Sequence, residues 1–214
     1  MVDNLYNSSE ESLRRVAKIT GKEIPFIKAE LCNEDEVEAL FAQHPGIDAV
    51  IHFAGLKAVG ESVAKPLEYY SNNLISTLYL LQAMRRHGVR NFVFSSSATV
   101  YGDPATVPIR EDFPTGGTTN PYGTSKLFQE RILSDICAAD PSLNVALLRY
   151  IGQRVAAGLL IGVEHIQHRV AVAGAQVADK QPAVLRQLFR IKPPRGLIQR
   201  PPPFQNLRRI TGYE

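Results

Sequence analysis

Amphipathic segments alternate with short apolar runs along the first part of the chain. Leu13, Val16 and Ile19 recur at helical spacing between residues 9 and 20. Gly21 follows this segment, and glycine commonly ends a helix in the left-handed conformation. The next apolar run, residues 24–31, has the length of a short strand. The pattern therefore opens with a helix followed by a strand.

The same alternation continues after residue 32. Asn33 followed by Glu36 predicts a capped helix start. The residues of this helix that share one apolar face are Val37, Leu40 and Phe41. Residues 48–53 then read as a buried parallel strand, because the run is short, apolar and flanked by loops.

Two more helix and strand pairs complete the pattern. A long helix should run from Pro66 to Gly88, with an apolar face of Tyr69, Tyr70, Leu74, Leu81 and Met84. Residues 91–95 predict a strand, 125–137 a helix and 145–148 another strand. The order α-β-α-β-α-β-α-β indicates an α/β, Rossmann-like doubly wound parallel sheet. Such sheets bind ligands at the carboxyl ends of their strands, here after Phe53, Ser97 and Tyr150.

Composition and charge divide the chain near residue 150. Of its 214 residues, 44% are hydrophobic and 21% charged, as in ordinary globular proteins. Residues 1–150 hold fourteen Lys and Arg against eighteen Asp and Glu, a net charge of −4; residues 151–214 hold ten against three, a net charge of +7. We expect a folded domain at 1–150 and a basic, Pro/Ala/Gly-rich tail at 151–214 that is poorly packed. The tail has few aromatic residues, so nucleic-acid binding is not expected.

The composition also limits where the protein acts and which metals it binds. No run approaches the roughly 18 apolar residues of a membrane span, and the start Met1–Asn4 lacks the pattern of a secretory signal. We therefore expect a cytoplasmic protein without a membrane partner. Cys32 and Cys137 stand far apart, with no cysteine and histidine cluster, so no metal site is expected.

The segment Tyr122-Gly-Thr-Ser-Lys126 places a phenol and an ammonium four residues apart. On a helix these positions share one face, and a nearby positive charge favours the phenolate. Taken alone, this spacing is common on exposed helices. Ser95 to Gly102, which includes Ser97, Ala98 and Thr99, ends a strand upstream, and its hydroxyls suit a sugar hydroxyl or a proton relay. A serine-rich turn is the plainer interpretation.

The run from Ile51 to Ser62 contains small residues where a strand leaves the sheet. Ala54 and Gly55 would let a flat cofactor approach the backbone, and Lys57 could reach ribose hydroxyls or phosphate. By composition alone this is an ordinary exit from a strand. His52 fits the core better than catalysis.

Three segments in this order, HFAGLKAVGES, SSSATVYG and NPYGTSK, resemble the UDP-glucose 4-epimerases of the extended short-chain dehydrogenase/reductase type. The resemblance runs from about Asp3 to Tyr150. It implies NAD-dependent 4-epimerisation of UDP-sugars through a transient 4-keto sugar. It also implies a homodimer, formed through the long helices near Leu74 and Phe128.

The resemblance assigns the roles of individual residues. Tyr122 is the acid/base, assisted by Ser97, while Lys126 holds the cofactor ribose and lowers the pKa of the tyrosine. The sugar site comprises Ser97, Ala98, Thr99 and Tyr122. Residues assigned to NAD are Asp3, Asn4, Asn7, Glu30, Leu31, Phe53, Ala54, Gly55, Lys57, Tyr122, Lys126 and Tyr150. Dehydratases of this superfamily carry an acidic residue near Ser97–Thr99, and its absence here favours epimerisation.

The sequence also departs from this family. Asp3 matches the ribose-binding acid, which normally follows a strand and a Gly-rich phosphate turn by about 20 residues. Glu30 stands where the family usually has an Asp. The resemblance ends after Tyr150, before the expected substrate domain. We therefore expect a chain truncated at its start and divergent after residue 150. The alternative is a catalytically inactive fragment that acts, if at all, as a binding or interaction module.

Overall fold

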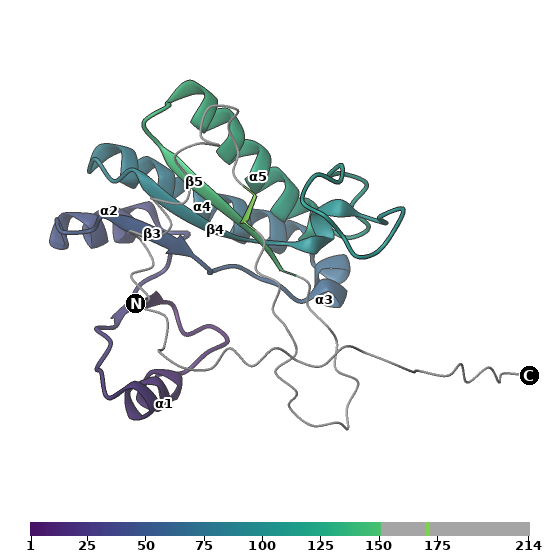
Figure 1. Ribbon diagram of the computed structural model, residues 1–214. Coiled ribbons are helices and arrows are strands. Elements are labelled where there is room, and N and C mark those ends of the chain that lie inside the picture. The colour runs from purple at the N-terminus through teal and green to yellow at the C-terminus, as the bar shows by residue number, and fades with distance from the viewer. Residues whose placement is uncertain (151–169, 172–214) are drawn as a thin grey trace, which may run out of the picture. The chain divides into compact units, whose positions relative to one another are not determined.

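The computed structural model describes residues 1–150 and the backbone of 170–171, and it has parallel strands flanked by helices (Figure 1). Its elements are β1 (Val2–Asp3), α1 (Glu11–Thr20), β2 (Ile27–Lys28), α2 (Glu34–Gln43), β3 (Ala49–His52), α3 (Val59–Ala64), α4 (Pro66–Arg86), β4 (Asn91–Ser97), η1 (Ala98–Tyr101), α5 (Pro121–Ala139), β5 (Asn144–Tyr150) and β6 (Val170–Ala171). The predicted α/β class is confirmed.

The described strands form two separate sheets. One contains β1 and β2, which pair in parallel; the other has the order β3-β4-β5-β6, in which β3, β4 and β5 are parallel and β6 is antiparallel. The register of the second sheet places His52 beside Phe94 and Ser97 beside Tyr150. The carboxyl ends of β3 and β4 therefore lie together, as the sequence predicted.

Local sequence explains where most helices begin and end. Gly21 closes α1 with φ 67°, and its N–H donates to Ala17 O. Asn33 Oδ1 accepts from the N–H groups of Asp35 and Glu36 at the start of α2. The Glu36 carboxylate accepts hydrogen bonds from the side-chain Nδ2 of Asn33 and from the backbone N–H of Glu30. It does not accept from the backbone N–H of Asn33, as a capping box would require. Asn33 and Glu36 thus mark the helix start as predicted, with different bonds.

Some predicted element boundaries were wrong, and some short elements were missed. Helix α5 begins at Pro121 instead of 125, because Asn120 caps it and Pro121 suits the first helical position. Strand β2 covers only Ile27–Lys28 of the predicted run 24–31. Strand β1, helix α3 and turn η1 were not predicted, because each is too short to show a period.

The core lies between β4, β5 and the helices α2, α4 and α5, with α4 and α5 on the same face of the sheet (Figure 1). The buried residues of α2 are Val37, Leu40 and Phe41, the face that the periodicity predicted. Met84 and Phe92 pack with them and are 1% exposed. This burial fixes α4 and α5 behind the strands whose carboxyl ends carry the site.

Chain contacts divide the protein into two units, Met1–Gln176 and Val177–Glu214. The expected basic tail, 151–214, lies outside the described residues except for β6, so the boundary at 150 stays a prediction. Among the described helices, none combines the length and apolarity needed to cross a membrane.

Candidate functional site

Ser97, Tyr122 and Lys126 are brought together at the carboxyl end of β4. Ser97 is the last residue of β4, and its Oγ accepts from Thr99 N at 3.2 Å and from Thr99 Oγ1 at 3.0 Å. The first turn of α5 lies against this turn, since a Cβ at Gly123 would lie 3.2 Å from Thr99. Tyr122 is half-buried beside Ser97.

Lys126 is buried with its ammonium turned to the sheet. Its Nζ donates to Ser95 O at 2.9 Å and lies 4.7 Å from the centre of the Phe94 ring. Burial lowers the pKa of Lys126 to about 8. The lysine is therefore far easier to neutralise than one in water.

Tyr122 does not show the lowered pKa that the spacing predicted. Burial raises the pKa of Tyr122, and the hydrogen bond with Ser97 opposes this rise without cancelling it. The helical spacing gave the shared face correctly, but the Lys126 ammonium is engaged by Ser95 O. Desolvation of the phenolate is therefore the dominant influence on the pKa of Tyr122.

Asn73, which the sequence analysis missed, links the loop after β3 to α5. Its Oδ1 accepts from Leu56 N at 2.8 Å, and its Nδ2 donates to Leu56 O and to Ser125 Oγ, each at 3.0 Å. Asn73 is fully buried. The signal was the pair Asn72-Asn73 in the middle of a predicted helix, since asparagine is unfavourable there without hydrogen-bond partners.

Gly55 sits where a side chain would be strained. Its φ is 144°, and a Cβ there would lie 3.0 Å from Asn73 Oδ1 and 3.8 Å from Lys126 Nζ. The backbone of the loop after β3 therefore passes directly beside Asn73 and Lys126. The predicted cofactor loop and the predicted catalytic helix meet at this point.

A buried polar network of Thr77, Gln129 and His52 extends from the backbone carbonyl of Asn73. Thr77 Oγ1 donates to Asn73 O at 3.1 Å and accepts from Gln129 Nε2 at 2.6 Å. The same hydroxyl is 3.0 Å from His52 Nε2, which must therefore be the protonated nitrogen. Burial and the charge of Lys126 lower the pKa of His52 to about 3. His52 is a neutral core residue, as the sequence analysis favoured.

The remaining candidate cofactor residues gather around one cavity of about 1270 Å³. Those that line it are Asp3, Asn4, Asn7, Glu30, Leu31, Phe53, Ala54, Gly55 and Lys57. The lining does not include Tyr122, Lys126, Ser97, Ala98 or Thr99, but the Lys126 ammonium lies beside Gly55, which is part of it. The side chain of Tyr150 lies outside the described residues.

Carboxylates gather at one end of this cavity. Asp3 Oδ1 accepts from Leu5 N and Ser8 Oγ, both at 2.7 Å. Glu30 Oε2 accepts from Asn4 Nδ2 at 2.7 Å. Burial raises the pKa of Glu30, but hydrogen bonds from Asn4 and Cys32 outweigh it and lower the pKa overall. Two carboxylates therefore face the space where the sequence predicts the adenosine.

The described residues fit the two halves of a dinucleotide. Asp3 and Glu30 offer acceptors for ribose hydroxyls and an adenine amine. At Gly55 the backbone carries no side chain, so a cofactor could approach it closely, and the Lys126 amine lies beside it. Within the described residues, no cluster of three or more His, Cys, Asp and Glu could hold a metal.

Known proteins match the described part of the chain. A family described as "NAD dependent epimerase/dehydratase family" matches residues 1–153. The UDP-glucose 4-epimerases of Haemophilus influenzae and Mus musculus are 57% identical over 150 residues and 53% over 156. Each match covers 70% of this chain and 44% or 45% of the relative, so the chain spans less than half of either.

Solved structures give the same likeness. A UDP-glucose 4-epimerase from Bifidobacterium longum, in complex with NAD+ and UDP, is 60% identical with a TM-score of 0.67. One from Stenotrophomonas maltophila, with bound NAD and formylated UDP-arabinopyranose, is 42% identical with a TM-score of 0.66. Both matches cover 70% of this chain and 44% of the solved chain. The likeness thus includes the strands, loops and helix that carry the site.

Proposed function

Because this chain belongs to the NAD dependent epimerase/dehydratase family, we propose that it carries the catalytic half of an NAD-dependent UDP-sugar 4-epimerase. The observation that carries this proposal is the meeting of Ser97, Tyr122, Lys126 and Gly55 at the carboxyl ends of β3 and β4. The proposed reaction is the interconversion of UDP-glucose and UDP-galactose, and the enzyme is therefore an isomerase of galactose metabolism.

NAD+, when bound, would supply the hydride acceptor that allows sugar C4 to pass through a 4-keto form and be reduced again from the opposite face. Tyr122 removes the proton from the sugar 4-hydroxyl and returns it after the keto sugar has turned over. Ser97 orients that hydroxyl and relays the proton, since its Oγ lies between the tyrosine and Thr99. The net change is inversion at C4, with the proton and hydride both restored.

The raised pKa of Tyr122 makes the neighbouring charges important. The phenol needs stabilisation as phenolate before it can accept a proton near pH 7. Lys126 lies on the same helical face, and binding of the cofactor ribose would place a second partner on its ammonium. We assign Asp3, Asn4 and Asn7 to the adenosine ribose, Glu30 and Leu31 to the adenine, and Phe53, Ala54, Gly55, Lys57 and Tyr150 to the nicotinamide half.

The hydroxyl-rich turn favours epimerisation over dehydration. Ser97, Ala98 and Thr99 supply hydroxyls and a methyl group, and none of the three can serve as the acid that dehydration needs at this turn. Turn η1 holds them beside Tyr122, because Ser97 caps it and Gly123 allows α5 to approach Thr99. We assign the sugar ring to this turn.

Interconversion of UDP-glucose and UDP-galactose, followed together with the NAD retained after purification, tests this proposal. The wild-type chain should interconvert the two sugars, and Tyr122→Phe should abolish turnover while retaining NAD. N-acetylated UDP-sugars assayed in parallel define the substrate range. Retained NAD without turnover of any UDP-sugar would contradict the enzymatic proposal and favour the alternative, an inactive binding module.

We further propose that two copies associate through α4 and α5. Phe128 is 47% exposed and stacks on Tyr70, with ring centroids 6.2 Å apart, while Leu78 is 37% exposed. Leu74 lies on the same helix as Leu78. Light scattering should give a dimer mass for the wild-type chain and a monomer mass for Phe128→Glu. A monomeric wild-type chain would contradict this interface.

A further inference from the structure

Turn η1 begins at the candidate reaction site and ends at a buried tyrosine. At its start, Ser97 Oγ accepts from Thr99 N at 3.2 Å, and the same hydroxyl favours the phenolate of Tyr122. Its last residue, Tyr101, is 7% exposed and takes no part in the proposed reaction. Because the turn is only 4 residues long, a displacement at its end is transmitted to its start.

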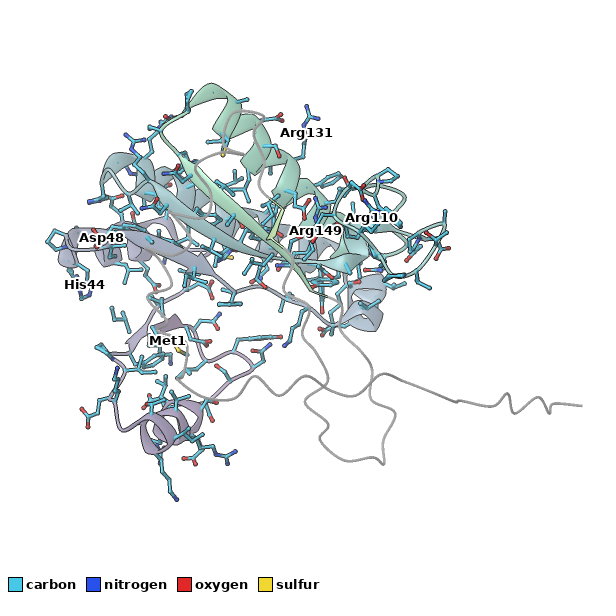
Figure 2. All side chains as sticks on the ribbon, viewed as in Figure 1. Met1, His44, Asp48, Arg110, Arg131 and Arg149 are labelled. Carbon is cyan, nitrogen blue, oxygen red and sulfur yellow. The ribbon has the colours of Figure 1, made fainter. Side chains whose placement is uncertain are left out.

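The buried end of η1 is held by Arg149 from the neighbouring strand β5 (Figure 2). Arg149 Nη1 donates to Tyr101 Oη at 2.8 Å, and the guanidinium carbon lies 4.9 Å from the centre of the Tyr101 ring. The strand register pairs Arg149 with Ser96, the residue directly before Ser97. One arginine is therefore next to both ends of the segment that carries the Ser97 hydroxyl.

The Glu130 carboxylate fixes the same guanidinium to helix α5. It accepts from Arg149 Nη2 at 2.7 Å and from Arg149 Nε at 2.9 Å. It also accepts from Ser96 Oγ at 2.5 Å. Tyr122 lies in the first turn of the same helix. A single buried carboxylate thus joins the helix that carries Tyr122 to the strand that ends in Ser97.

Backbone contacts hold the same end of the turn. Val100 is fully buried, and its carbonyl oxygen accepts from Gly116 N at 2.8 Å. Gly102, directly after the turn, has φ 62°, and a Cβ there would lie 2.6 Å from the carbonyl oxygens of Gly116 and Gly117. The chain after the turn is therefore closely packed, and the Arg149 bond adds a directional contact to this packing.

A buried ion pair is a costly way to gain stability alone, because both charges lose their water. Apolar residues of similar size often stabilise a protein as well or better. They cannot fix directions, whereas the planar guanidinium of Arg149 donates to Glu130 and Tyr101 at fixed angles. The cluster is therefore suited to fixing the position of η1 relative to α5.

We propose that Arg149, acting through Glu130 and Tyr101, is a positioning residue that keeps the Ser97 hydroxyl against the Tyr122 phenol. Loss of the bond to Tyr101 releases the end of the turn and moves Ser97 Oγ away from the phenol. The importance of this positioning for catalysis rests on the proposed function. The coupling between Arg149 and Tyr122 does not.

The surroundings of Tyr122 make its titration a direct report of this coupling. Burial opposes the phenolate, and the Ser97 hydroxyl favours it. Lys126 lies four residues along the same helix, but its ammonium donates to Ser95 O at 2.9 Å. A displaced Ser97 should therefore raise the pKa of Tyr122, because the phenolate loses a hydrogen bond and stays buried.

Titration of Tyr122 in the full chain, without cofactor, tests the proposal. The tyrosines are replaced biosynthetically by fluorotyrosine, whose phenol ionises at lower pH, and the fluorine NMR signal missing from Tyr122→Phe identifies the residue. Ser97→Ala should move the midpoint upward. Tyr101→Phe removes only the hydroxyl that Arg149 binds, and it should give at least about half of the shift caused by Ser97→Ala.

Two further variants separate positioning from stability. Arg149→Lys keeps the charge beside Glu130 but lacks the fork that also binds Tyr101, so it should shift the midpoint as Tyr101→Phe does. Tyr69→Phe is the matched control, because Tyr69 is 1% exposed and its hydroxyl also donates to a carboxylate, Glu61 Oε2, at 2.9 Å. It should leave the midpoint unchanged. Urea unfolding confirms that each variant folds.

The double variant Ser97→Ala/Tyr101→Phe identifies the route of the coupling. If the cluster acts through Ser97, the double variant should have the same midpoint as Ser97→Ala alone. Additive shifts would overturn the proposal, as would a Ser97→Ala midpoint equal to that of the wild type. Unchanged midpoints in Tyr101→Phe and Arg149→Lys, or an equal shift in Tyr69→Phe, would also overturn it.

Turnover of UDP-glucose separates this proposal from the proposed function. In an active chain, Tyr101→Phe should lower kcat at neutral pH, and kcat should recover as the pH rises past the new midpoint, with little change in KM. A raised KM without recovery in alkaline solution would overturn the positioning role. A shifted titration in a chain that turns over no UDP-sugar supports the positioning role and contradicts the proposed function.

Discussion

Arg149 of β5 and Glu130 of α5 form a two-point ion pair inside the protein. Arg149 Nε lies 2.9 Å from Glu130 Oε1, and Nη2 lies 2.7 Å from Oε2. Arg149 Nη1 also donates to Tyr101 Oη at 2.8 Å. The side chains are 13% and 6% exposed, so α5, β5 and η1 are joined by one buried charged cluster. Burial lowers the pKa of Arg149, but the bonds to Glu130 and Tyr101 outweigh it and raise the pKa.

Removing one member of this pair should destabilise the protein strongly. Arg149→Met leaves the Glu130 carboxylate buried without its partner, which typically costs about 3–5 kcal/mol of unfolding free energy. Urea unfolding measures this change. Arg131 is the matched control, because its pair with Asp135 is 77% and 62% exposed; Arg131→Met should change stability by less than about 1 kcal/mol. Figure 2 labels both arginines. Equal effects of the two substitutions would contradict the buried role.

Gly55→Ala should destabilise the loop between β3 and α3. The new Cβ would lie 3.0 Å from Asn73 Oδ1, at a φ of 144° that side chains rarely adopt. We expect a loss of about 1–3 kcal/mol, the usual range for one strained backbone position. Gly46→Ala is the control, since a Cβ there meets nothing within 4 Å and Gly46 has no positive φ. Urea unfolding of the two variants under the same conditions compares them.

The buried Lys126 should make stability depend on pH in alkaline solution. Its folded pKa of about 8 lies below the ordinary 10.5, so the unfolded chain binds more protons between these values. The contribution of Lys126 to the unfolding free energy should therefore rise from about pH 8 to 10.5. The unfolding free energy of the wild type minus that of Lys126→Met, measured at each pH, isolates this contribution, because the titration of all other groups is common to both proteins. A flat difference across this window would contradict the assigned burial.

Both cysteines should react slowly with thiol reagents in the folded protein. Burial, with the nearby charge of Glu30, raises the pKa of Cys32 to about 11, and burial with Asp140 raises that of Cys137. Since the thiolate is the reactive form, disulfide exchange with Ellman's reagent at pH 8 should be slow until urea unfolds the chain. The absorbance of the released thiolate reports the rate. Rapid reaction of either thiol in native buffer would contradict this prediction.

Short-range patterns were enough to predict the class and several helix ends. The period of Val37, Leu40 and Phe41 identified the buried face of α2, because a helix repeats every 3.6 residues. Gly21 and Asn33 marked helix ends, since caps act within a few residues of each other. Pro121 was overlooked as the start of α5, although Asn120 before it carries the same kind of capping signal.

The sequence by itself determined the parallel α/β order and the positions of Ser97, Tyr122 and Lys126 on a strand end and one helical face. Only the tertiary structure decided that the Lys126 ammonium donates to Ser95 O and that burial raises the pKa of Tyr122. It alone also decided that Asn73 links the loop after β3 to α5. It also decided that β1 and β3 line a common cavity. The reason is physical: spacing fixes which residues share a face, whereas desolvation and strand pairing depend on atoms distant in the sequence.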